Sequence, residues 1–327
     1  MKRIVILGDG AWGTALALIL VRKGRRPVLW SRFPEYAARV RERRENFRFL
    51  PGVPLPEAVE VTWGPPPEAD LYVAAVPTQF LRETLVELRP HLCRRAIHVC
   101  VAKGLEMSTG RRPSEILREV VGRVRIVVLS GPSHAPELAR RLPASVVAAG
   151  EEEAAREVQR LFGGDVLRVY TSRDALGVEL GGALKNVIAL AGGVCDGLGL
   201  GHNAKAALLT RGIVEMARLG VRLGARRSTF FGLSGIGDLI ATTSFPSGRN
   251  LSVGRAVGAG KPLEEALRSI EGVAEGVWTV KAVAALARRH GVDMPITREV
   301  HAIFHEGKDP RVALRDLMSR RARPEED

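Results

Sequence analysis

Residues 3–24 read RIVILGDGAWGTALALILVRKG. The apolar run at the start of this stretch predicts a buried strand, and the longer apolar run after it, closed by Gly24, predicts a helix. A G-x-G-x-x-G pattern joins the two, formed by Gly8, Gly10 and Gly13. In this setting the first glycine allows a tight turn, the second lets a pyrophosphate approach the backbone, and the third lets helix and strand pack closely. The stretch therefore predicts a dinucleotide-binding unit with an anion at the helix N-terminus.

The same alternation of strand and helix continues through the first half of the chain. Further strand-like runs occupy residues 27–31, 59–63, 71–77, 96–102, 125–131 and 144–150. Nearly continuous β-branched runs that alternate with helical segments are typical of a mostly parallel sheet covered on both faces. We therefore expect an α/β fold in which residues 1–173 form a Rossmann-type domain with a mostly parallel sheet.

From residue 174 onward the pattern is helical. Long periodic apolar segments occupy residues 175–194, 204–223, 263–270, 277–290 and 296–304. Residues 174–327 are therefore expected to form a second, mostly α-helical domain of ordinary size. Its glycine-rich loops carry compact polar clusters, as binding loops on a rigid scaffold do.

Composition places the chain among soluble globular proteins, with 46% hydrophobic and 26% charged residues in 327. An apolar, strand-like run starts directly after the first three residues, so we expect no leader, and no apolar run is long enough to cross a membrane uninterrupted. The three cysteines are odd in number and lack C-x-x-C spacing, so we expect neither a metal site nor disulfides. A reducing cytoplasm is the expected compartment.

The net charge is +13, and arginine carries most of it. Basic and acidic residues are interleaved, which is typical of solvated helix faces, and no nucleic-acid-binding motif is present. We therefore expect no nucleic-acid partner. The positive field instead favours anionic small molecules.

Lys185 and Asn186 stand in the middle of an otherwise apolar segment, residues 180–193, which reads LGGALKNVIALAGG. Lysine is rarely buried without a partner, so a lysine retained here is a candidate for proton transfer. Gly181, Gly182 and Ala189 lie on its face of the helix, and we expect them to leave room for a substrate. The alternative is that Lys185 reaches solvent or pairs with an acid such as Asp238.

Three loops follow predicted strands, at residues 76–80, 102–106 and 130–137, and should meet where ligands bind in parallel sheets. Lys103 is thus expected beside the cofactor, its alternative being an exposed surface lysine. In the third loop Ser133 is expected to cap the next helix, and His134 to be a solvated residue at the helix start.

The second predicted strand has no acid at its end, where dehydrogenases specific for NAD place one for the ribose hydroxyls. Arg32 stands there instead, with the Ser31 hydroxyl beside it. We therefore expect NADP or NAD as cofactor, with NADP preferred because Arg32 would meet its 2′-phosphate. The alternative is that Arg32 stacks on the adenine ring.

Several motifs occur together in a fixed order. They are GDGAWGTA, AKGLE, SGPSHAPE, GVELGGALKNVIALAGG, NAKAALLTRG, GIGDL, GRN and VAEGV. With these motifs the whole chain resembles the soluble NAD(P)-dependent glycerol-3-phosphate dehydrogenase family. The resemblance implies a Rossmann domain followed by a helical substrate domain. It also implies reduction of dihydroxyacetone phosphate to sn-glycerol 3-phosphate, which in bacteria feeds phospholipid synthesis.

The resemblance also implies roles for individual residues. Lys185 matches the proton donor and acceptor, and Asn186, Lys103 and Asp238 match its neighbours in the active site, Lys103 being shared by cofactor and substrate. The other implied substrate contacts are Gly131, Ser133, Thr242, Gly248, Arg249 and Asn250. The implied cofactor contacts are Gly8, Gly10, Ala11, Trp12, Gly13, Arg32, Lys103, Ala135, Arg249, Val273 and Glu275.

One position departs from the family. Bacterial members commonly read S-R-N where this chain has Gly248, Arg249 and Asn250. The missing serine contact leaves two substitutes open, Ser247 or a backbone N–H group.

The chemistry agrees with these roles. Hydride transfer to a ketone creates an alkoxide, which needs a proton and a nearby positive charge, and Lys185 can supply both. The planar fork of Arg249 suits a phosphate, although Arg249 and Asn250 could also be an ordinary helix start with a surface arginine.

Two other functions stay open. One is a two-domain dehydrogenase of hydroxy or keto acids, against which the phosphate-directed loop argues. The other is a cofactor-sensing protein without turnover, which would have no need of Lys185. The expected partner is a phosphorylated triose, and the chain could also form a homodimer.

Overall fold

The computed structural model describes residues 2–246, 248–322 and 324–325. Its single eight-stranded sheet has the order β3-β2-β1-β4-β5-β6-β7-β8. Neighbouring strands are parallel except β6 and β7, which are antiparallel. The strands are β1 Ile4–Leu7, β2 Val28–Trp30, β3 Glu60–Thr62, β4 Leu71–Ala74, β5 Ile97–Cys100, β6 Arg125–Ser130, β7 Ala144–Gly150 and β8 Leu167–Ser172. The predicted fold class, a mostly parallel Rossmann-type sheet followed by helices, is confirmed.

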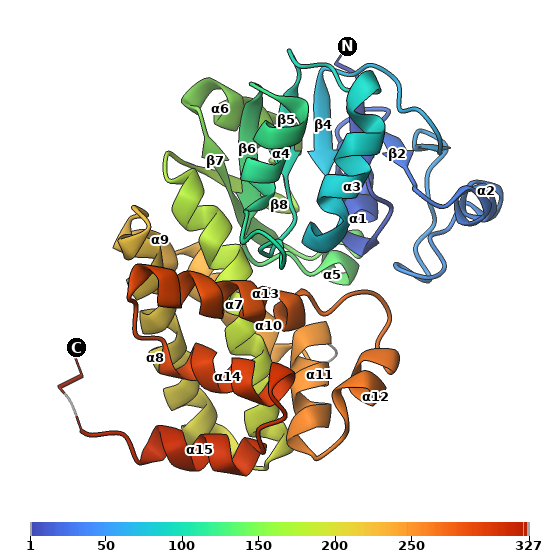
Figure 1. The fold of residues 1–327 in the computed structure, drawn as a ribbon. Helices are drawn as coiled ribbons and strands as arrows, with labels where there is room; N and C mark the ends of the chain where they lie inside the picture. Colours follow the sequence, from blue (N-terminus) through green and yellow to red (C-terminus); the bar gives the residue numbers. More distant parts are fainter. Residues whose placement is uncertain (1, 247, 323, 326–327) are drawn as a thin grey trace.

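Helices cover both faces of this sheet (Figure 1). They are α1 Ala11–Arg22, α2 Pro34–Arg43, α3 Thr78–Leu88, α4 Pro113–Val121, α5 Ala135–Ala139 and α6 Glu152–Phe162. Side chains alternate along β1, so Ile4 and Ile6 pack with α1, α2, α5 and α6, whereas Val5 and Leu7 pack in the core that contains α3 and α4.

The glycine-rich turn after β1 has the geometry that the motif requires. Gly8 has φ +117°, and a Cβ atom there would lie 2.7 Å from the carbonyl oxygen of Ala75. A Cβ on Gly13 would lie 2.1 Å from the Gly8 carbonyl oxygen, so α1 can approach the turn only with glycine at this position. A Cβ on Gly10 would meet nothing within 4 Å, so the backbone there faces open space.

The second half of the chain forms helices below the carboxyl ends of the strands (Figure 1). They are α7 Ala175–Gly197, α8 Gly201–Arg222, α9 Arg227–Phe230, α10 Asp238–Ser244, α11 Arg249–Gly258, α12 Leu263–Arg268, α13 Glu275–His290, α14 Pro295–His305 and α15 Pro310–Met318, with a π-helical turn at Leu233–Gly237. The predicted division at residues 173 and 174 falls between β8 and α7.

Helix α7 is the centre of the helical part and packs most closely against α11. A Cβ on Gly193 would lie 2.3 Å from the Leu251 carbonyl oxygen, and one on Gly254 would lie 2.2 Å from the Leu190 carbonyl oxygen. Glycines therefore let the two backbones touch. Of the helices in the described residues, α7 alone is long and apolar enough to cross a membrane, but its apolar window is wholly buried inside the molecule, as in a core helix.

Candidate active site

Two lysines from different halves of the chain converge on one carboxylate. Lys185, in the middle of α7, places its Nζ 3.0 Å from Oδ1 of Asp238, the first residue of α10. Lys103, just beyond β5, places its Nζ 2.7 Å from Oδ2 of the same aspartate. The three side chains therefore form one charged cluster at the carboxyl edge of the sheet.

Lys185 is buried at 6% exposure, and its Nζ also donates to the Thr242 hydroxyl at 2.5 Å. Burial lowers the pKa of Lys185, and so do the positive charges of Lys103 and Arg249, whereas Asp238 raises it. The resulting pKa is about 8. For Asp238, burial raises the pKa, but the two ammonium groups outweigh burial and hold it below its usual range. Lys185 does pair with Asp238, and even in this pair its pKa lies close to neutral pH.

Lys103 is held by the turn that follows β6. Its Nζ donates to the Gly131 carbonyl oxygen and to the Ser133 hydroxyl oxygen, both at 2.9 Å. The Ser133 hydroxyl in turn donates to the Gly131 carbonyl oxygen at 2.8 Å. We expected Ser133 to cap α5, but it does not. Its hydroxyl is used inside the site, and α5 begins only at Ala135.

His134, which precedes α5, is not the solvated residue that we expected. Its ring lies 3.7 Å, centre to centre, from the ring of Phe245, which follows α10. Its Nδ1 atom is buried without a hydrogen-bond partner among the described residues, and burial lowers its pKa. His134 therefore contributes to the contact between the two halves of the molecule.

A chain of amide groups ties the site together, and sequence reasoning did not foresee it. Asn186 donates to the Lys103 carbonyl oxygen at 2.8 Å. Asn250 donates to the side-chain oxygen of Asn186 at 3.0 Å and accepts from the backbone N–H of Gly276 at 2.9 Å. Asn186 and Asn250 thus fix the position of Lys103 relative to α7, α11 and α13. The family pattern named both asparagines, but nothing in the sequence showed that they bond to each other.

Arg249 begins α11 with an exposed side chain. It is close enough to lower the pKa of Lys185. Gly248 precedes it, and the Gly248 N–H donates to the Phe245 carbonyl oxygen at 3.0 Å, so this backbone group is already occupied. Ser247, the other substitute that we considered for the missing serine, lies outside the described residues.

We expected the small residues beside Lys185 to leave room for a substrate, but Gly181 and Gly182 do not. A Cβ on Gly181 would lie 2.7 Å from the Ser234 carbonyl oxygen. A Cβ on Gly182 would lie 2.7 Å from the Ser130 hydroxyl oxygen and 3.4 Å from the Lys103 side chain. These glycines instead allow the π-helical turn and Lys103 to approach α7.

The turn after β1 has features that fit a bound dinucleotide. The backbone at Gly10 faces open space at the N-terminus of α1. The Trp12 Nε1 atom and the Asp9 Oδ2 atom are buried, and neither has a hydrogen-bond partner among the described residues. Free N–H groups at a helix N-terminus with an unused indole donor suit a pyrophosphate and its sugars.

At the end of β2, Arg32 donates to Glu83 of α3 at 2.6 Å and to the Thr84 hydroxyl at 3.3 Å. The neighbouring Ser31 is fully buried, and its hydroxyl accepts from the Phe33 N–H at 3.2 Å. Arg32 is therefore a partly buried cation beside the expected adenosine end, already paired with an acid.

On the other side of the expected cofactor crevice, Glu275 begins α13 and accepts from the backbone N–H of Thr78 at 2.6 Å. Burial raises its pKa, while Thr78 lowers it. Val273 lies in the preceding loop and is partly exposed. The Glu275 contact joins the helical half to the loop after β4.

Known proteins resemble the chain over almost its full length. The N-terminal and C-terminal parts of NAD-dependent glycerol-3-phosphate dehydrogenase match residues 3–156 and 174–315. The chain belongs to this family. It is an NAD(P)-dependent oxidoreductase, as the sequence predicted.

Three relatives illustrate the similarity. Glycerol-3-phosphate dehydrogenase [NAD(P)+] of Moorella thermoacetica is 49% identical over 98% of this chain and 96% of its own. The enzyme of that name from Thermus thermophilus is 48% identical over 99% of this chain and 100% of its own. The crystal structure of glycerol-3-phosphate dehydrogenase from Coxiella burnetii is 37% identical, with a TM-score of 0.92 over 98% of this chain and 99% of that one.

Proposed function

We propose that this dehydrogenase reduces dihydroxyacetone phosphate to sn-glycerol 3-phosphate, reversibly, with Lys185 as the proton donor and acceptor. The observation that carries the proposal is the buried Lys185 ammonium, which contacts Asp238 and Thr242 and has a pKa of about 8. A proton-transfer group works best when its pKa lies near the working pH. Residues 1–173 would hold the cofactor, and residues 174–327 would supply most of the substrate site.

When bound, the nicotinamide cofactor would supply or accept the hydride. As the carbonyl carbon of the ketone gains that hydride, the C=O electron pair moves onto oxygen, and the oxygen takes a proton from the Lys185 ammonium. In the reverse direction the neutral Lys185 amine accepts the hydroxyl proton. Lys103 adds a second positive charge at the developing oxyanion, which lowers the barrier in a water-poor site.

Asp238 acts by holding both lysines. With one oxygen on each ammonium, it fixes their separation and offsets their mutual repulsion. Asn186 and Asn250 add the uncharged links that align Lys103 with α7. Such a prearranged cluster needs little reorganisation when charge develops on the substrate.

Arg249 is the proposed clamp on the substrate phosphate, with Asn250 beside it at the start of α11. Arg249 is exposed. Among the described residues, 2–246, 248–322 and 324–325, it forms no ion pair. Its planar fork can therefore bind two phosphate oxygens. The implied contacts of Gly131, Ser133, Thr242 and Gly248 with the substrate, and of Ala11, Ala135, Val273 and Glu275 with the cofactor, belong to the same proposal.

We infer that NADP is preferred over NAD, through Arg32. In the cell the enzyme would be cytoplasmic and would supply glycerol 3-phosphate for phospholipid synthesis, and it could act as a homodimer.

The direct test follows NADPH oxidation optically after dihydroxyacetone phosphate is added. A lack of oxidation with this ketone, or faster oxidation with an unphosphorylated keto acid, would contradict the proposed substrate.

A further inference from the structure

A cavity lies away from the two lysines. Its volume is about 930 Å³, which is large enough for a nucleotide. It is bounded by α4, by the start of β6 and by the first turn of α7. Arg94 and Arg95 precede β5, and Arg123 precedes β6, so the cavity opens at the amino edge of the sheet, whereas Lys103 lies at the carboxyl edge.

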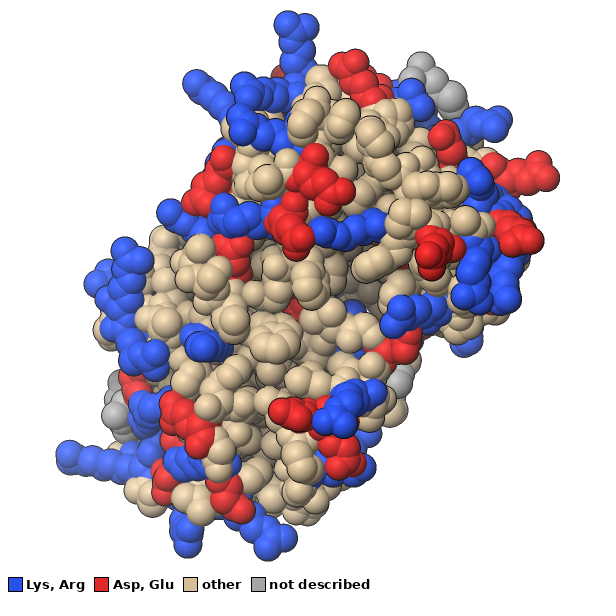
Figure 2. Space-filling view, turned by 45° about the vertical axis from the view of Figure 1, so that its right-hand side comes forward, with Lys and Arg blue, Asp and Glu red and all other residues tan. Residues whose placement is uncertain are grey.

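Arginine dominates the wall of this cavity. Arg94, Arg95, Arg118 and Arg123 are exposed, and within the part of the chain that the structure describes no carboxylate pairs with any of them. Figure 2 shows basic side chains gathered at the upper left of the sheet domain, where the amino ends of the strands lie. Four unpaired guanidinium groups around one hollow repel one another, and an anion would relieve that repulsion.

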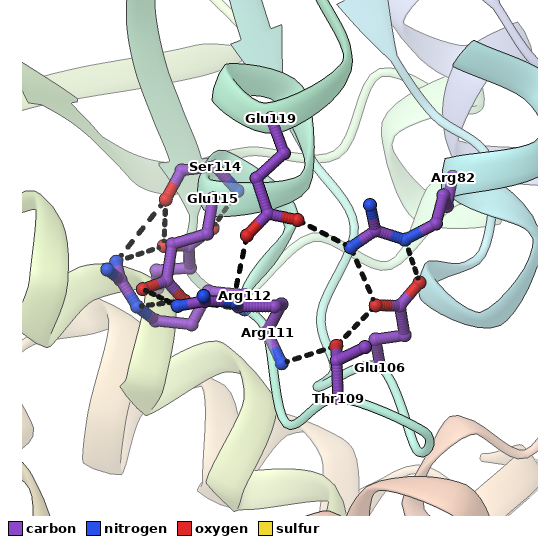
Figure 3. A network of polar contacts seen from close by, with 9 residues as sticks. Arg82, Glu106, Thr109, Arg111, Arg112, Ser114, Glu115 and Glu119 are labelled. Atoms are coloured by element: carbon purple, nitrogen blue, oxygen red, sulfur yellow. Dashed lines mark hydrogen bonds and ion pairs between the residues drawn. The ribbon is translucent and has the colours of Figure 1, made fainter. Parts of the chain in front are cut away.

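The three other arginines of the wall have partners. Arg112 pairs with Glu115 in the polar network at the start of α4 (Figure 3). It also pairs with Glu179. Arg125 donates to the Arg95 carbonyl oxygen at 2.7 Å. Arg173 pairs with Glu152. Carboxylates thus offset the charges of Arg112 and Arg173, whereas Arg125 keeps its charge because its partner is a neutral carbonyl oxygen.

Few acidic groups offset this charge. The lining carboxylates are Glu151 and Asp174. Asp174 is committed to the start of α7, since it accepts from the Gly177 N–H at 2.9 Å and from the Thr229 hydroxyl at 2.6 Å. The cavity thus keeps a net positive charge.

The lining also has an apolar part. Val124, Ile126 and Val128 contribute from β6 and the residue before it, and Ala175 and Leu176 contribute from α7. Ile126 and Val128 are almost fully buried in the core below. An occupant would therefore meet cations at the rim and the partly exposed side chains of Val124, Ala175 and Leu176.

We propose that this cavity binds a nucleoside polyphosphate, with its phosphates on the arginine rim and its base on the aliphatic residues. Guanidinium groups bind phosphate oxygens in pairs, and a flat base can cover apolar surface. A second copy of this chain is a poorer occupant, because each copy carries a net charge of +13. The proposal does not depend on the catalytic roles proposed above.

The test is calorimetric titration of Mg²⁺-free ATP into the full-length enzyme saturated with NADPH, so that the cofactor site is already filled. We expect one ATP per chain, with affinity that falls as salt is raised. The variant R94Q/R118Q/R123Q should weaken this binding about tenfold to a hundredfold, since each exposed charge pair contributes a factor of about two to five. The control R288Q/R311Q/R315Q removes the same charge from exposed helix positions of the helical half. Its affinity for ATP should stay within twofold of that of the wild type.

Tripolyphosphate tests the apolar part of the site in the same experiment. Because it lacks a base, it should bind about tenfold more weakly than ATP. Absence of ATP binding to the NADPH-saturated enzyme would overturn the proposal. So would equal weakening in both triple variants, which would mean a general charge effect, or equal affinity for ATP and tripolyphosphate, which would mean that no base is recognised.

Discussion

Oδ1 of Asp238 lies 3.0 Å from Nζ of Lys185, and this contact joins the middle of the most buried helix to the first residue of α10. The other oxygen of Asp238 is taken by Lys103. The carboxylate is therefore shared, and neither ammonium is fully neutralised. This sharing explains how a lysine can remain buried in α7 and still exchange its proton near pH 8.

Lys185→Ala should abolish turnover while the fold and cofactor binding persist. The variant removes the proton donor, and such groups contribute about 10²–10⁴-fold to rate. We expect kcat to fall by that factor, measured as NADPH oxidation with dihydroxyacetone phosphate, and the Kd for NADPH to change less than threefold. A variant that kept more than about a tenth of the wild-type kcat would refute the assigned role.

The rate should depend on pH with opposite signs in the two directions. Reduction needs the Lys185 ammonium, so its kcat/KM should fall as pH rises through about 8. Oxidation of glycerol 3-phosphate needs the neutral amine, so its kcat/KM should rise through the same pH. Asp238→Asn removes the charge that raises the Lys185 pKa and should move both inflections to lower pH. Inflections that stay in place in this variant would argue that another group titrates.

The glycines between α7 and α11 predict a large difference between two neighbouring substitutions. In Gly193→Ala the new Cβ would lie 2.3 Å from the Leu251 carbonyl oxygen, so the helices must separate, at a cost of about 1–3 kcal/mol or more. In Gly192→Ala the nearest atom is a Thr243 methyl at 3.6 Å, an ordinary contact. Urea unfolding should show Gly193→Ala to be destabilised and Gly192→Ala to be unchanged or slightly more stable. Equal effects would mean that the close approach of the helices does not limit stability.

The sequence predicted the sheet well because local patterns decide it. Gly8 has a positive φ, and Gly13 packs against the Gly8 carbonyl oxygen within the same turn, so the spacing of these glycines indicates the local geometry. The antiparallel pairing of β7 with β6 was not predicted, because its strand pattern is the same in either direction.

The site was less predictable, because its geometry depends on contacts between distant segments. Family resemblance pointed to Lys103, Lys185 and Asp238, yet their separations in sequence of 53 and 135 residues carry no information about which atoms meet. The prediction that Gly182 leaves room for a substrate was wrong for the same reason. Its neighbour in space is Ser130, which lies far away in the sequence and belongs to β6.

Arg249→Ala should distinguish phosphorylated from unphosphorylated substrate. Without the guanidinium, the KM for dihydroxyacetone phosphate should rise steeply, about 10–100-fold, since a charge-assisted hydrogen bond contributes roughly 1.5–3 kcal/mol. The already poor activity with dihydroxyacetone should change little, because that ketone has no phosphate to bind. Steady-state kinetics with both ketones measures the difference, and similar losses on the two would show that Arg249 acts on something other than the phosphate.

The last prediction concerns Arg32 and its partner Glu83, which lie 2.6 Å apart. If Arg32 meets the 2′-phosphate of NADP, that phosphate must compete with Glu83 for the same guanidinium. Arg32→Ala should then lower kcat/KM for NADPH about tenfold or more and leave NADH nearly unchanged. Glu83→Gln should have the opposite effect and favour NADPH further, because it frees the cation without removing it.

Glu87, 3.7 Å from Arg32, provides the matched control. Glu87→Gln removes the same charge from the same face of α3 but lies farther from the guanidinium, so its effect on NADPH should be smaller than that of Glu83→Gln. The measurement is kcat/KM for both cofactors in wild type and the three variants. If Arg32 instead stacks on the adenine ring, Arg32→Ala would weaken NADPH and NADH alike, and neither glutamate variant would change the preference between them.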